Sequence, residues 1–342
     1  MANRTNSTDV VWMWKSNKNP WNSSEETEWR PYSDVETVII EEAYRKNLSE
    51  VLLDDYHINL KNSVQISNSN ANSQRPVKRV QRRVSASEPK LRETRFEVTP
   101  IHPATPFTDQ GFFLGYMGEI FTMFNISNSN ELLEPENRRL LIEKAANGII
   151  TEGKLLGKQK EAEWMAQQIL NVIDEDNQKV WECCAHLYTM ESFLYQKMNE
   201  YMRLCGDPQS KTIWKSKMQT FGPLAYILSM FTYAKTYEEI YVYRGANLTD
   251  DLIKQFQDNI GAYLMFPALT STSRNRKKAE QFGNVLFIIH TSTQDGLDVV
   301  EFSDYPDEEE IMLKADYTFY IRSCTFDEVK HKWIINISSW KN

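Results

Sequence analysis

Several features that define whole classes of protein are missing from this sequence of 342 residues. No run of about 18 apolar residues occurs, so no membrane-spanning helix is predicted. Residues 1–8 contain no apolar segment, so we expect no secretory signal. The expected setting is therefore intracellular, in the cytoplasm or the nucleus, and no membrane partner is expected.

Residues that bind metals or form disulfides are also scarce. The sequence has five histidines, which form no cluster, and four cysteines, Cys183, Cys184, Cys205 and Cys324, which lack metal-ligand spacing. The first three cysteines fall in helix-like sequence, where a free cysteine usually acts as a small buried hydrophobic residue. A reduced protein without a metal cofactor is the default expectation.

The charge balance excludes another class. The net charge is −8, from 39 basic and 47 acidic residues, which argues against direct nucleic-acid binding by the chain as a whole. Hydrophobic residues make up 41% of the sequence, which is enough for a packed core. The length suggests two domains or one large one.

The N-terminal part is rich in aromatic residues. Trp12, Trp14 and Trp29 precede a helix expected to start near Val38, and residues 56–60 alternate like a strand. This pattern resembles a WWE domain, with Trp12 or Trp14, Trp29 and Glu41 as its namesake residues. The resemblance predicts a half-barrel of strands with one helix over residues 5–85.

Some WWE domains bind the iso-ADP-ribose unit of poly(ADP-ribose). The resemblance implies that Tyr32 stacks on adenine, that Tyr56 and Gln65 line the pocket, and that Arg75 holds phosphate, with Lys78 as a weaker candidate. Aromatic faces stack on bases and guanidinium groups grip phosphate oxygens, so the chemistry fits. The alternative is that the two tyrosines are core residues and that Arg75 is a solvated edge charge.

A basic segment follows. Between Arg75 and Arg95 there are eight basic residues against two acidic ones. Such a run is usually a solvated linker or strand edge, although it could add affinity for a polyanion such as poly(ADP-ribose). Four prolines from Pro89 to Pro106 favour extended backbone, and we interpret residues 86–110 as a linker.

In the rest of the sequence, the spacing of apolar residues changes once, at about Ile240. Apolar residues between residues 136 and 235 recur at three- and four-residue steps, which predicts helices. From Ile240 onward the pattern predicts strands at 240–244, 263–270, 285–290, 297–302, 311–314, 317–321 and 333–337, with helices near 249–258 and 275–283. A helical front half and a strand-rich back half indicate an α+β domain.

Three short motifs lie at strand edges in that back half. Tyr243-Arg244-Gly245 ends the first strand, Ser271-Thr272-Ser273 follows the second, and Glu308-Glu309-Glu310 directly precedes an apolar strand. Each motif alone has an ordinary structural explanation, since arginines form ion pairs, hydroxyls satisfy turns and acidic runs are usually solvated.

The order of these motifs resembles the arginine-specific mono-ADP-ribosyltransferases, which carry Arg, Ser-Thr-Ser and Glu-x-Glu. The resemblance covers about residues 111–340 and implies a catalytic domain with a β-sandwich-like second half. It implies an NAD(P)+–protein-arginine ADP-ribosyltransferase that uses NAD as substrate and protein arginines as acceptors. The family often has a proline-containing turn after the Glu-x-Glu strand, which residues 313–317 lack.

The resemblance also assigns roles. Glu310 would hydrogen-bond the ribose 2′-hydroxyl and stabilise the oxocarbenium ion, and Glu308 would orient the acceptor guanidinium. We assign Glu310 as the second glutamate because it abuts the apolar strand. Ser271 would orient the catalytic carboxylate, and Ser273 would support the site. Arg244 would clamp the phosphates, and Gly245 would allow the backbone to approach the ligand.

Two other functions remain compatible with the sequence. Water could replace arginine as the acceptor, which would make the protein an NAD glycohydrolase. Alternatively, the protein could be a catalytically silent reader that binds poly(ADP-ribose) or ADP-ribosylated proteins through its N-terminal domain.

Overall fold

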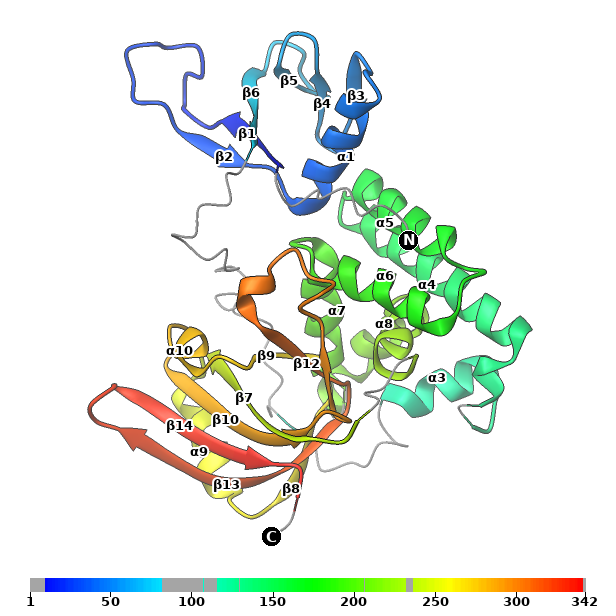
Figure 1. Ribbon diagram of the computed structural model, residues 1–342, viewed down its shortest axis with the longest axis vertical. Helices are drawn as coiled ribbons and strands as arrows, with labels where there is room; N and C mark the ends of the chain where they lie inside the picture. Colours follow the sequence, from blue (N-terminus) through cyan, green and yellow to red (C-terminus); the bar gives the residue numbers. More distant parts are fainter. Residues whose placement is uncertain are drawn as a thin grey trace. The chain divides into compact units, whose positions relative to one another are not determined.

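The structure is a computed structural model that describes residues 10–81, 107, 116–128, 130–205, 207–231 and 236–340 (Figure 1). The chain divides into two compact units. The N-terminal unit comprises Met1–Glu88, Ile149–Gln167 and Met190–Phe193, and the C-terminal unit comprises Pro89–Gly148, Gln168–Thr189 and Leu194–Asn342. The expected linker, residues 86–110, lies outside the described residues except for Phe107.

The N-terminal unit contains a six-stranded antiparallel sheet and helix α1 (Asp34–Arg45). The strands are β1 (Val10–Lys15), β2 (Trp29–Pro31), β3 (Glu50–Leu52), β4 (Tyr56–Asn59), β5 (Val64–Ser67) and β6 (Gln74–Gln81), in the order β2-β1-β6-β5-β4-β3. The predicted combination of a sheet with one helix is confirmed. The helix begins four residues before the predicted start at Val38.

The start of α1 is fixed by local chemistry. The Ser33 hydroxyl accepts a hydrogen bond from the Glu36 amide at 3.1 Å, and the Glu36 carboxylate accepts one from the Ser33 amide at 3.0 Å. This reciprocal capping box satisfies two amides that have no partner inside the helix. The apolar face of α1, including Val35 and Ile40, is fully buried.

A buried carboxylate on α1 ties the helix to the sheet. Glu41 is 3% exposed and accepts hydrogen bonds from Trp12 Nε1 at 3.0 Å, from Arg79 at 2.9 Å and from Arg45 at 2.8 Å. Burial alone would raise the pKa of Glu41, but these donors lower it to about 2. The structure thus pairs Trp12, rather than Trp14, with Glu41.

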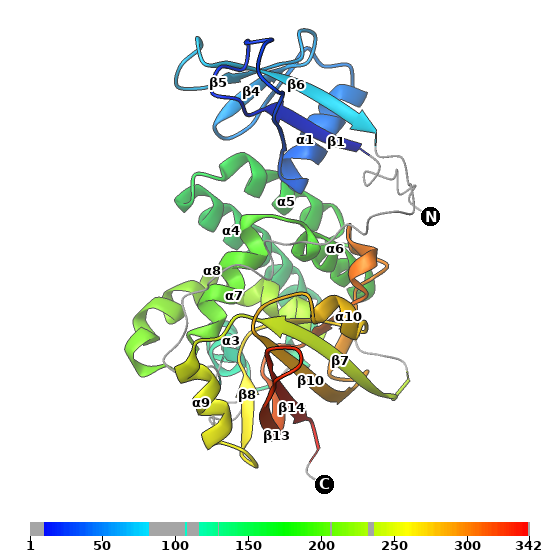
Figure 2. The same cartoon turned by 90° about the vertical axis from the view of Figure 1, so that its left-hand side faces the viewer.

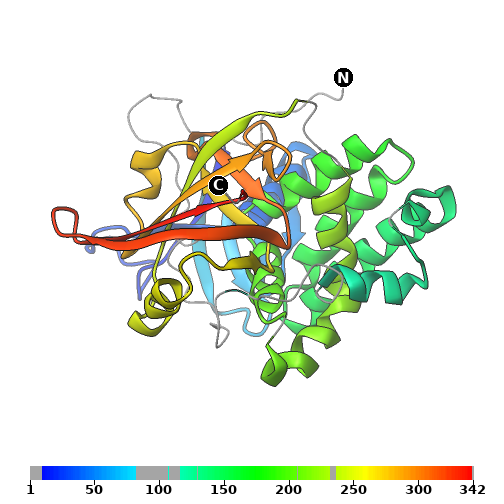
Figure 3. The ribbon, with the colours of Figure 1, turned by 90° about the horizontal axis from the view of Figure 1, so that it is seen from below.

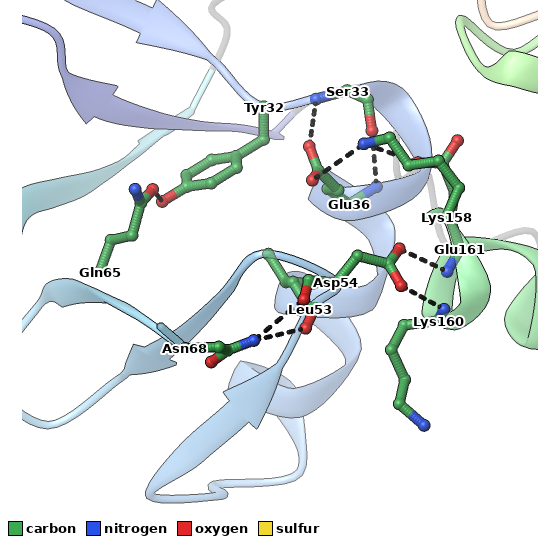
Figure 4. Close-up of polar contacts among 10 residues, drawn as sticks. All are labelled: Tyr32, Ser33, Glu36, Leu53, Asp54, Gln65, Asn68, Lys158, Lys160 and Glu161. Carbon is green, nitrogen blue, oxygen red and sulfur yellow. Dashed lines mark hydrogen bonds and ion pairs between the residues drawn. The ribbon is translucent and has the colours of Figure 1, made fainter. Parts of the chain in front are cut away.

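The same unit includes the start of helix α5 (Gln159–Asn171). The Asp54 carboxylate, on the turn between β3 and β4, accepts hydrogen bonds from the amides of Lys160 at 2.7 Å and Glu161 at 3.3 Å (Figure 4). These amides lie in the first turn of the helix, where a carboxylate is favoured both as an acceptor and by the helix dipole. Trp164 Nε1 adds a hydrogen bond to Glu42 at 3.2 Å.

Most of the remaining long helices fall in the helical region predicted between residues 136 and 235, and one precedes it. They are α3 (Tyr116–Phe124), α4 (Pro135–Leu155), α6 (Asn177–Thr189), α7 (Phe193–Arg203) and α8 (Lys211–Met230), with short 3-10 turns at Glu131–Leu133 and Pro208–Ser210. Helix α4 contributes residues to both units, as does α5. Residues 232–235, at the end of the predicted helical region, lie outside the described part of the chain.

The C-terminal unit contains an eight-stranded sheet. Its strands are β7 (Glu239–Ala246), β8 (Tyr263–Phe266), β9 (Thr270–Ser273), β10 (Val285–Ser292), β11 (Gly296–Asp298), β12 (Glu310–Leu313), β13 (Tyr317–Asp327) and β14 (Lys332–Ser338). They are ordered β11-β12-β9-β7-β10-β14-β13-β8. The predicted α+β class is confirmed.

The sheet surrounds an apolar core to which β10 contributes a nearly continuous buried run. Helix α9 (Asp250–Asp258) packs near β13, and the short helix α10 (Arg276–Ala279) lies beside β7 (Figure 2). Strands β13 and β14 form a long hairpin, seen from below in Figure 3. Phe107 belongs to this core and contacts Phe256 edge-on, with 5.1 Å between ring centroids.

One strand was predicted incorrectly. Residues 263–270 were expected as a single strand, but they contain the whole of β8 and the first residue of β9, separated by residues 267–269. Strand β8 pairs with β13, whereas β9 pairs with β12 and meets β7 at Ser273. Pro267 donates no backbone hydrogen bond, so the chain leaves the first ladder there. The strand predicted at 297–302 also ends early, at Asp298.

Three features were expected to be absent: disulfides, membrane-spanning helices and metal sites. The four cysteines are free, and no helix within the described residues is long and apolar enough to cross a membrane. Among the described residues, no group of three or more His, Cys, Asp or Glu side chains could hold a metal ion.

We predict that replacing Glu161 changes the pH dependence of stability. Glu161 is 2% exposed, and burial raises its pKa to about 7, with Lys158 lowering it and Glu36 and Asp54 raising it. Between the ordinary pKa of 4.5 and about 7 the folded state binds more protons than the unfolded state, so stability falls as pH rises. Glu161→Gln should therefore flatten this slope and stabilise the protein above pH 7.

The measurement is urea unfolding at a series of pH values. Glu163→Gln is the matched control, because Glu163 lies on the same helix, is partly exposed and pairs with Lys160 at 2.8 Å. Loss of this exposed ion pair should change the free energy of unfolding by less than about 1 kcal/mol. An unchanged slope in Glu161→Gln would show that the carboxyl does not titrate in this range.

Candidate active site

In the acidic run at residues 307–310, two carboxylates are buried and the other two are accessible to solvent. The 3-10 turn Pro306–Glu308 is followed by Glu309 in the left-handed conformation, with φ 48°, and then by strand β12. Glu308 is 5% exposed and Glu310 is 2% exposed, whereas Asp307 is exposed and Glu309 is half-exposed. The buried pair is the one expected from the Glu-x-Glu pattern.

Strand β9 holds this turn in place. Glu310 pairs with Ser273 and Met312 with Ser271 in the β9–β12 ladder. Paired residues point to the same face of a sheet and alternate residues share a face, so Ser271, Ser273 and Glu310 lie on one face. Thr272 lies on the other face, toward the core.

The hydroxyls of β9 bind the backbone of the acidic segment. Ser273 Oγ donates to the Glu308 carbonyl oxygen at 2.7 Å and accepts from the Asn275 amide at 2.9 Å. Thr272 Oγ1 donates to the Ile311 carbonyl oxygen at 2.6 Å. These bonds fix the backbone on both sides of Glu310, so Ser273 is the hydroxyl that supports Glu308.

Arg244 joins the same group of residues from β7. Its Nη1 donates to the carbonyl oxygen of Ser271 at 2.6 Å, and the preceding residue, Tyr243, pairs with Ser273. A planar guanidinium anchored in this way keeps a defined orientation. Arg244 on β7 therefore contacts the backbone of β9, the strand whose side chains Ser271 and Ser273 share a face with Glu310.

Two further residues, at the start of α10 and within it, hold the acidic turn. Lys278 Nζ contacts Glu309 Oε1 at 2.8 Å and donates to the Asp307 carbonyl oxygen, and Asn275 Nδ2 donates to Glu309 at 3.1 Å. The hydrogen bond from Lys278, followed by the one from Asn275, lowers the pKa of Glu309. About 30 residues separate these partners, so no local pattern could have revealed them.

Gly245 has a structural reason to be glycine. A Cβ at this position would lie 2.2 Å from the Ala279 carbonyl oxygen and 2.6 Å from that of Phe282. The expected role was close approach of a ligand to the backbone. The atoms that approach Gly245 closely in the structure belong to the end of α10 and to the residues after it.

The candidate ligand residues of the N-terminal unit also cluster. Ile58 pairs with Gln65, and Gln65 pairs with Arg75, so Tyr56, Gln65 and Arg75 share one face of the sheet. Tyr32 points toward Gln65 and donates to Gln65 Oε1 at 2.5 Å (Figure 4). Tyr32 is only 7% exposed, and burial raises its pKa well above the ordinary value. It offers little surface for stacking, unlike the half-buried Tyr56.

Arg75 is ordered by the chain itself. Its Nη1 donates to the carbonyl oxygens of Lys15 and Asn17, both at 2.9 Å, and its guanidinium lies over Trp14 at 5.4 Å from the ring centroid. Lys78 lies over Trp29 at 4.2 Å. These contacts give the Arg75 side chain a defined position.

Comparison with known proteins gives two family matches. Residues 155–342 match the sequence model of the NAD:arginine ADP-ribosyltransferases, and residues 10–79 match that of the WWE domain. Over 99 residues, 28% of the chain, the sequence is 37% identical to Mav of Mycobacterium avium (strain 104), a candidate NAD(+)–arginine ADP-ribosyltransferase. The match spans 12% of the length of Mav.

Solved structures give weaker likenesses. The ADP-ribosyltransferase HopU1 of Pseudomonas syringae pv. Tomato DC3000 is 25% identical, covering 42% of this chain and 64% of HopU1, with a TM-score of 0.36. The type III effector XopAI of Xanthomonas axonopodis pv. citri is 14% identical, covering 62% of this chain and 88% of XopAI, with a TM-score of 0.42.

We predict that Gly245→Ala destabilises the protein by about 1–3 kcal/mol, because the new methyl group would overlap backbone atoms that cannot move freely. Gly222→Ala is the matched control. The nearest atom to a Cβ at Gly222 is 3.6 Å away, and alanine is favoured over glycine inside a helix, so this variant should be neutral or slightly stabilised. Urea unfolding midpoints measure both; equal stability of the two variants would contradict the packing role of Gly245.

Proposed function

The chain belongs to the NAD:arginine ADP-ribosyltransferase family, and from that premise we propose that it transfers one ADP-ribose unit from NAD to arginine side chains of proteins, releasing nicotinamide. The family uses NAD as its substrate. The N-terminal WWE domain, predicted from its aromatic residues, is confirmed by the family match over residues 10–79. We keep the proposed boundaries of residues 5–85, 86–110 and 111–340 for the WWE domain, linker and catalytic domain.

The observation that carries the proposal is the pair of buried carboxylates, Glu308 and Glu310, beside the Ser-Thr-Ser strand that contacts Arg244. Cleavage of the nicotinamide–ribose bond spreads positive charge over the ribose ring. A carboxylate that is fixed in advance beside that charge stabilises the transition state more than the ground state.

The proposed roles are those that the family resemblance implies, and the burial and contacts of the residues support them. Glu310, at the start of β12, binds the ribose 2′-hydroxyl and stabilises the oxocarbenium ion. Glu308 orients the acceptor guanidinium, which a carboxylate can bind through two parallel hydrogen bonds, and assists removal of its proton. Arg244 binds the diphosphate. Ser271 and Ser273 position the carboxylates, with Ser273 acting through the Glu308 backbone.

Transfer and hydrolysis of NAD share Glu310 and differ in the acceptor. Glu308 favours transfer, because water as acceptor needs no second carboxylate to orient it. Labelled NAD and polyarginine distinguish the possibilities: label on polyarginine supports transfer, free ADP-ribose alone supports an NAD glycohydrolase, and neither product supports a silent reader.

Glu310→Gln should abolish both transfer and hydrolysis, with a loss of at least about 100-fold in rate, because the neutral amide does not stabilise the cationic ribose. The measurement is release of nicotinamide with and without polyarginine. Unfolding of the variant in urea controls for structure. Nicotinamide release at the wild-type rate would remove Glu310 from the mechanism.

Glu308→Gln should lose transfer to arginine by about 100-fold while retaining most of the hydrolysis, because its carboxylate serves the acceptor. Glu309→Gln is the matched control, since Glu309 lies between the two residues but turns outward to Lys278. It should retain both activities. An equal loss of transfer and hydrolysis in Glu308→Gln would contradict the role assigned to this residue.

We propose further that the WWE domain binds poly(ADP-ribose) or ADP-ribosylated proteins. Support comes from Tyr56, Gln65 and Arg75 on one face of the sheet, with Tyr32 hydrogen-bonded to Gln65. The domain would bring the catalytic domain to modified proteins. The proposed setting, cytoplasm or nucleus, is supported by the four free cysteines, because reduced thiols are typical of these compartments.

Arg75→Ala should weaken binding of poly(ADP-ribose) by about tenfold, since charge-assisted hydrogen bonds to phosphate contribute about 1.5–3 kcal/mol. The transferase rate should not change. Lys61→Ala, which removes an exposed charge from the turn between β4 and β5, is the control and should bind normally. Fluorescence anisotropy of a labelled polymer measures the affinity, and an equal effect of both substitutions would indicate nonspecific charge attraction.

A further inference from the structure

The C-terminal unit contains a cavity at the other end of the strand that carries Glu310. Strand β12 runs for four residues, roughly 13 Å at 3.3 Å per residue, and ends in a turn that leads to β13. A cavity of about 130 Å³ lies there, with a lining that includes Ser229, Met230, Asp295, Lys314, Asp316 and Tyr317. Since roughly 10–15 Å³ of such volume accommodates one water, the cavity has room for a small solvated ligand.

Asp316 is the unusual residue of this lining. It is 6% exposed, and neither carboxylate oxygen has a hydrogen-bond partner among the described residues. Its backbone adopts the left-handed conformation, with φ 59°, in the turn that lacks the expected proline. Glycine would adopt this conformation at less cost and would bury no charge. Asp316 therefore combines two unfavourable features, a left-handed backbone conformation and a buried carboxylate without a hydrogen-bond partner among the residues that the structure describes.

A second polar group in the lining shares this property. Ser229, near the end of α8, is 3% exposed, and its hydroxyl oxygen also has no hydrogen-bond partner in the described part of the chain. Buried polar groups in folded proteins are nearly always satisfied by protein, water or a ligand. Carboxylate and hydroxyl oxygens together form a donor set suited to a cation.

Asp295 and Lys314 also line the cavity. Their opposite charges compensate each other and leave the charge of Asp316 uncompensated. Gly296 pairs with Leu313, which brings the next residues, Asp295 and Lys314, together, and the Lys314 amide donates to the Asp295 carbonyl oxygen at 3.1 Å. Burial lowers the pKa of Lys314, and the charge of Asp295 opposes that change. The pKa of Asp316 is raised to about 7 by burial. One excess negative charge remains in the cavity at higher pH.

We propose that this cavity binds a small cation through the carboxylate of Asp316 and the hydroxyl of Ser229. The cation is either an inorganic ion or the cationic head of an organic group, such as a guanidinium, because both satisfy two carboxylate oxygens. A bound cation would connect α8 to the turn after β12 and so stabilise the strand that begins with Glu310. The site is independent of the proposed transfer reaction.

The test uses the full chain above pH 7, where Asp316 is ionised. Thermal unfolding is followed while CaCl₂, MgCl₂, KCl or methylguanidinium chloride is added, with choline chloride at equal ionic strength as the reference. One of these cations should raise the unfolding temperature saturably, because a ligand that binds only the folded state stabilises it. Saturation by a metal salt identifies an inorganic ion, and saturation by methylguanidinium identifies an organic cation.

Variants assign the effect to the cavity. Asp316→Asn keeps the side-chain shape, tolerates the left-handed conformation and should lose the cation-dependent shift. Asp316→Gly suits the same conformation and serves if the asparagine variant fails to fold. Ser229→Ala should weaken the affinity by about tenfold. Asp258→Asn, a surface carboxylate of α9, is the control and should respond as the wild type does.

The pH dependence gives an independent measure. Protons compete with the cation for Asp316, so the shift should shrink as the pH falls below about 7. Asp295, Lys314 and Tyr317 are the other titratable groups of the lining. No saturable response to any of the four cations, or a full response in Asp316→Asn, would overturn the proposal.

Discussion

The hydrogen bond from Ser273 to the backbone of Glu308 is the contact on which the proposed active site depends. It joins β9 to the turn that enters β12, at the point where the two strands begin to pair. Lys278 and Asn275 hold the exposed side of the acidic turn, and the Arg274 amide donates to the Glu309 carbonyl oxygen at 3.0 Å. Burial of Glu308 and Glu310 requires that the backbone between them stay fixed, because small displacements would expose both carboxylates to water.

Three buried carboxylates show that burial alone does not determine the pKa of an acidic side chain. Glu41 is surrounded by donors from Trp12, Arg45 and Arg79, and its pKa falls to about 2 despite burial. Burial raises the pKa of Asp316 and of Glu161 to about 7, the latter against the opposing charge of Lys158. The first carboxylate holds a sheet and a helix together.

Strand β12 connects two regions of the C-terminal unit. Its first residue, Glu310, belongs to the proposed active site, and the turn after its last residue contributes Asp316 to the cavity at its other end. The other residues of β12, Ile311, Met312 and Leu313, are completely buried. A packed strand of this kind transmits displacement along its length, since protein interiors have few voids to absorb it.

The sequence by itself determined the α+β class, the WWE domain, the helical region before Ile240 and most of the strands. Those conclusions rest on local periodicity and on short motifs, which depend on neighbouring residues alone. The choice of Glu310 also needed only the adjacent apolar residues. The break at Pro267 was missed, because a run of apolar residues does not show which ladder each half joins.

Only the tertiary structure decided the remaining points. It selected Trp12 as the partner of Glu41, showed that Gly245 accommodates the end of α10 and the residues after it, and brought Lys278 to the acidic turn. It also placed Asp316 in a cavity with Ser229, almost ninety residues earlier. These contacts join residues far apart in the chain, and their geometry follows from how strands and helices pack, which no local pattern encodes.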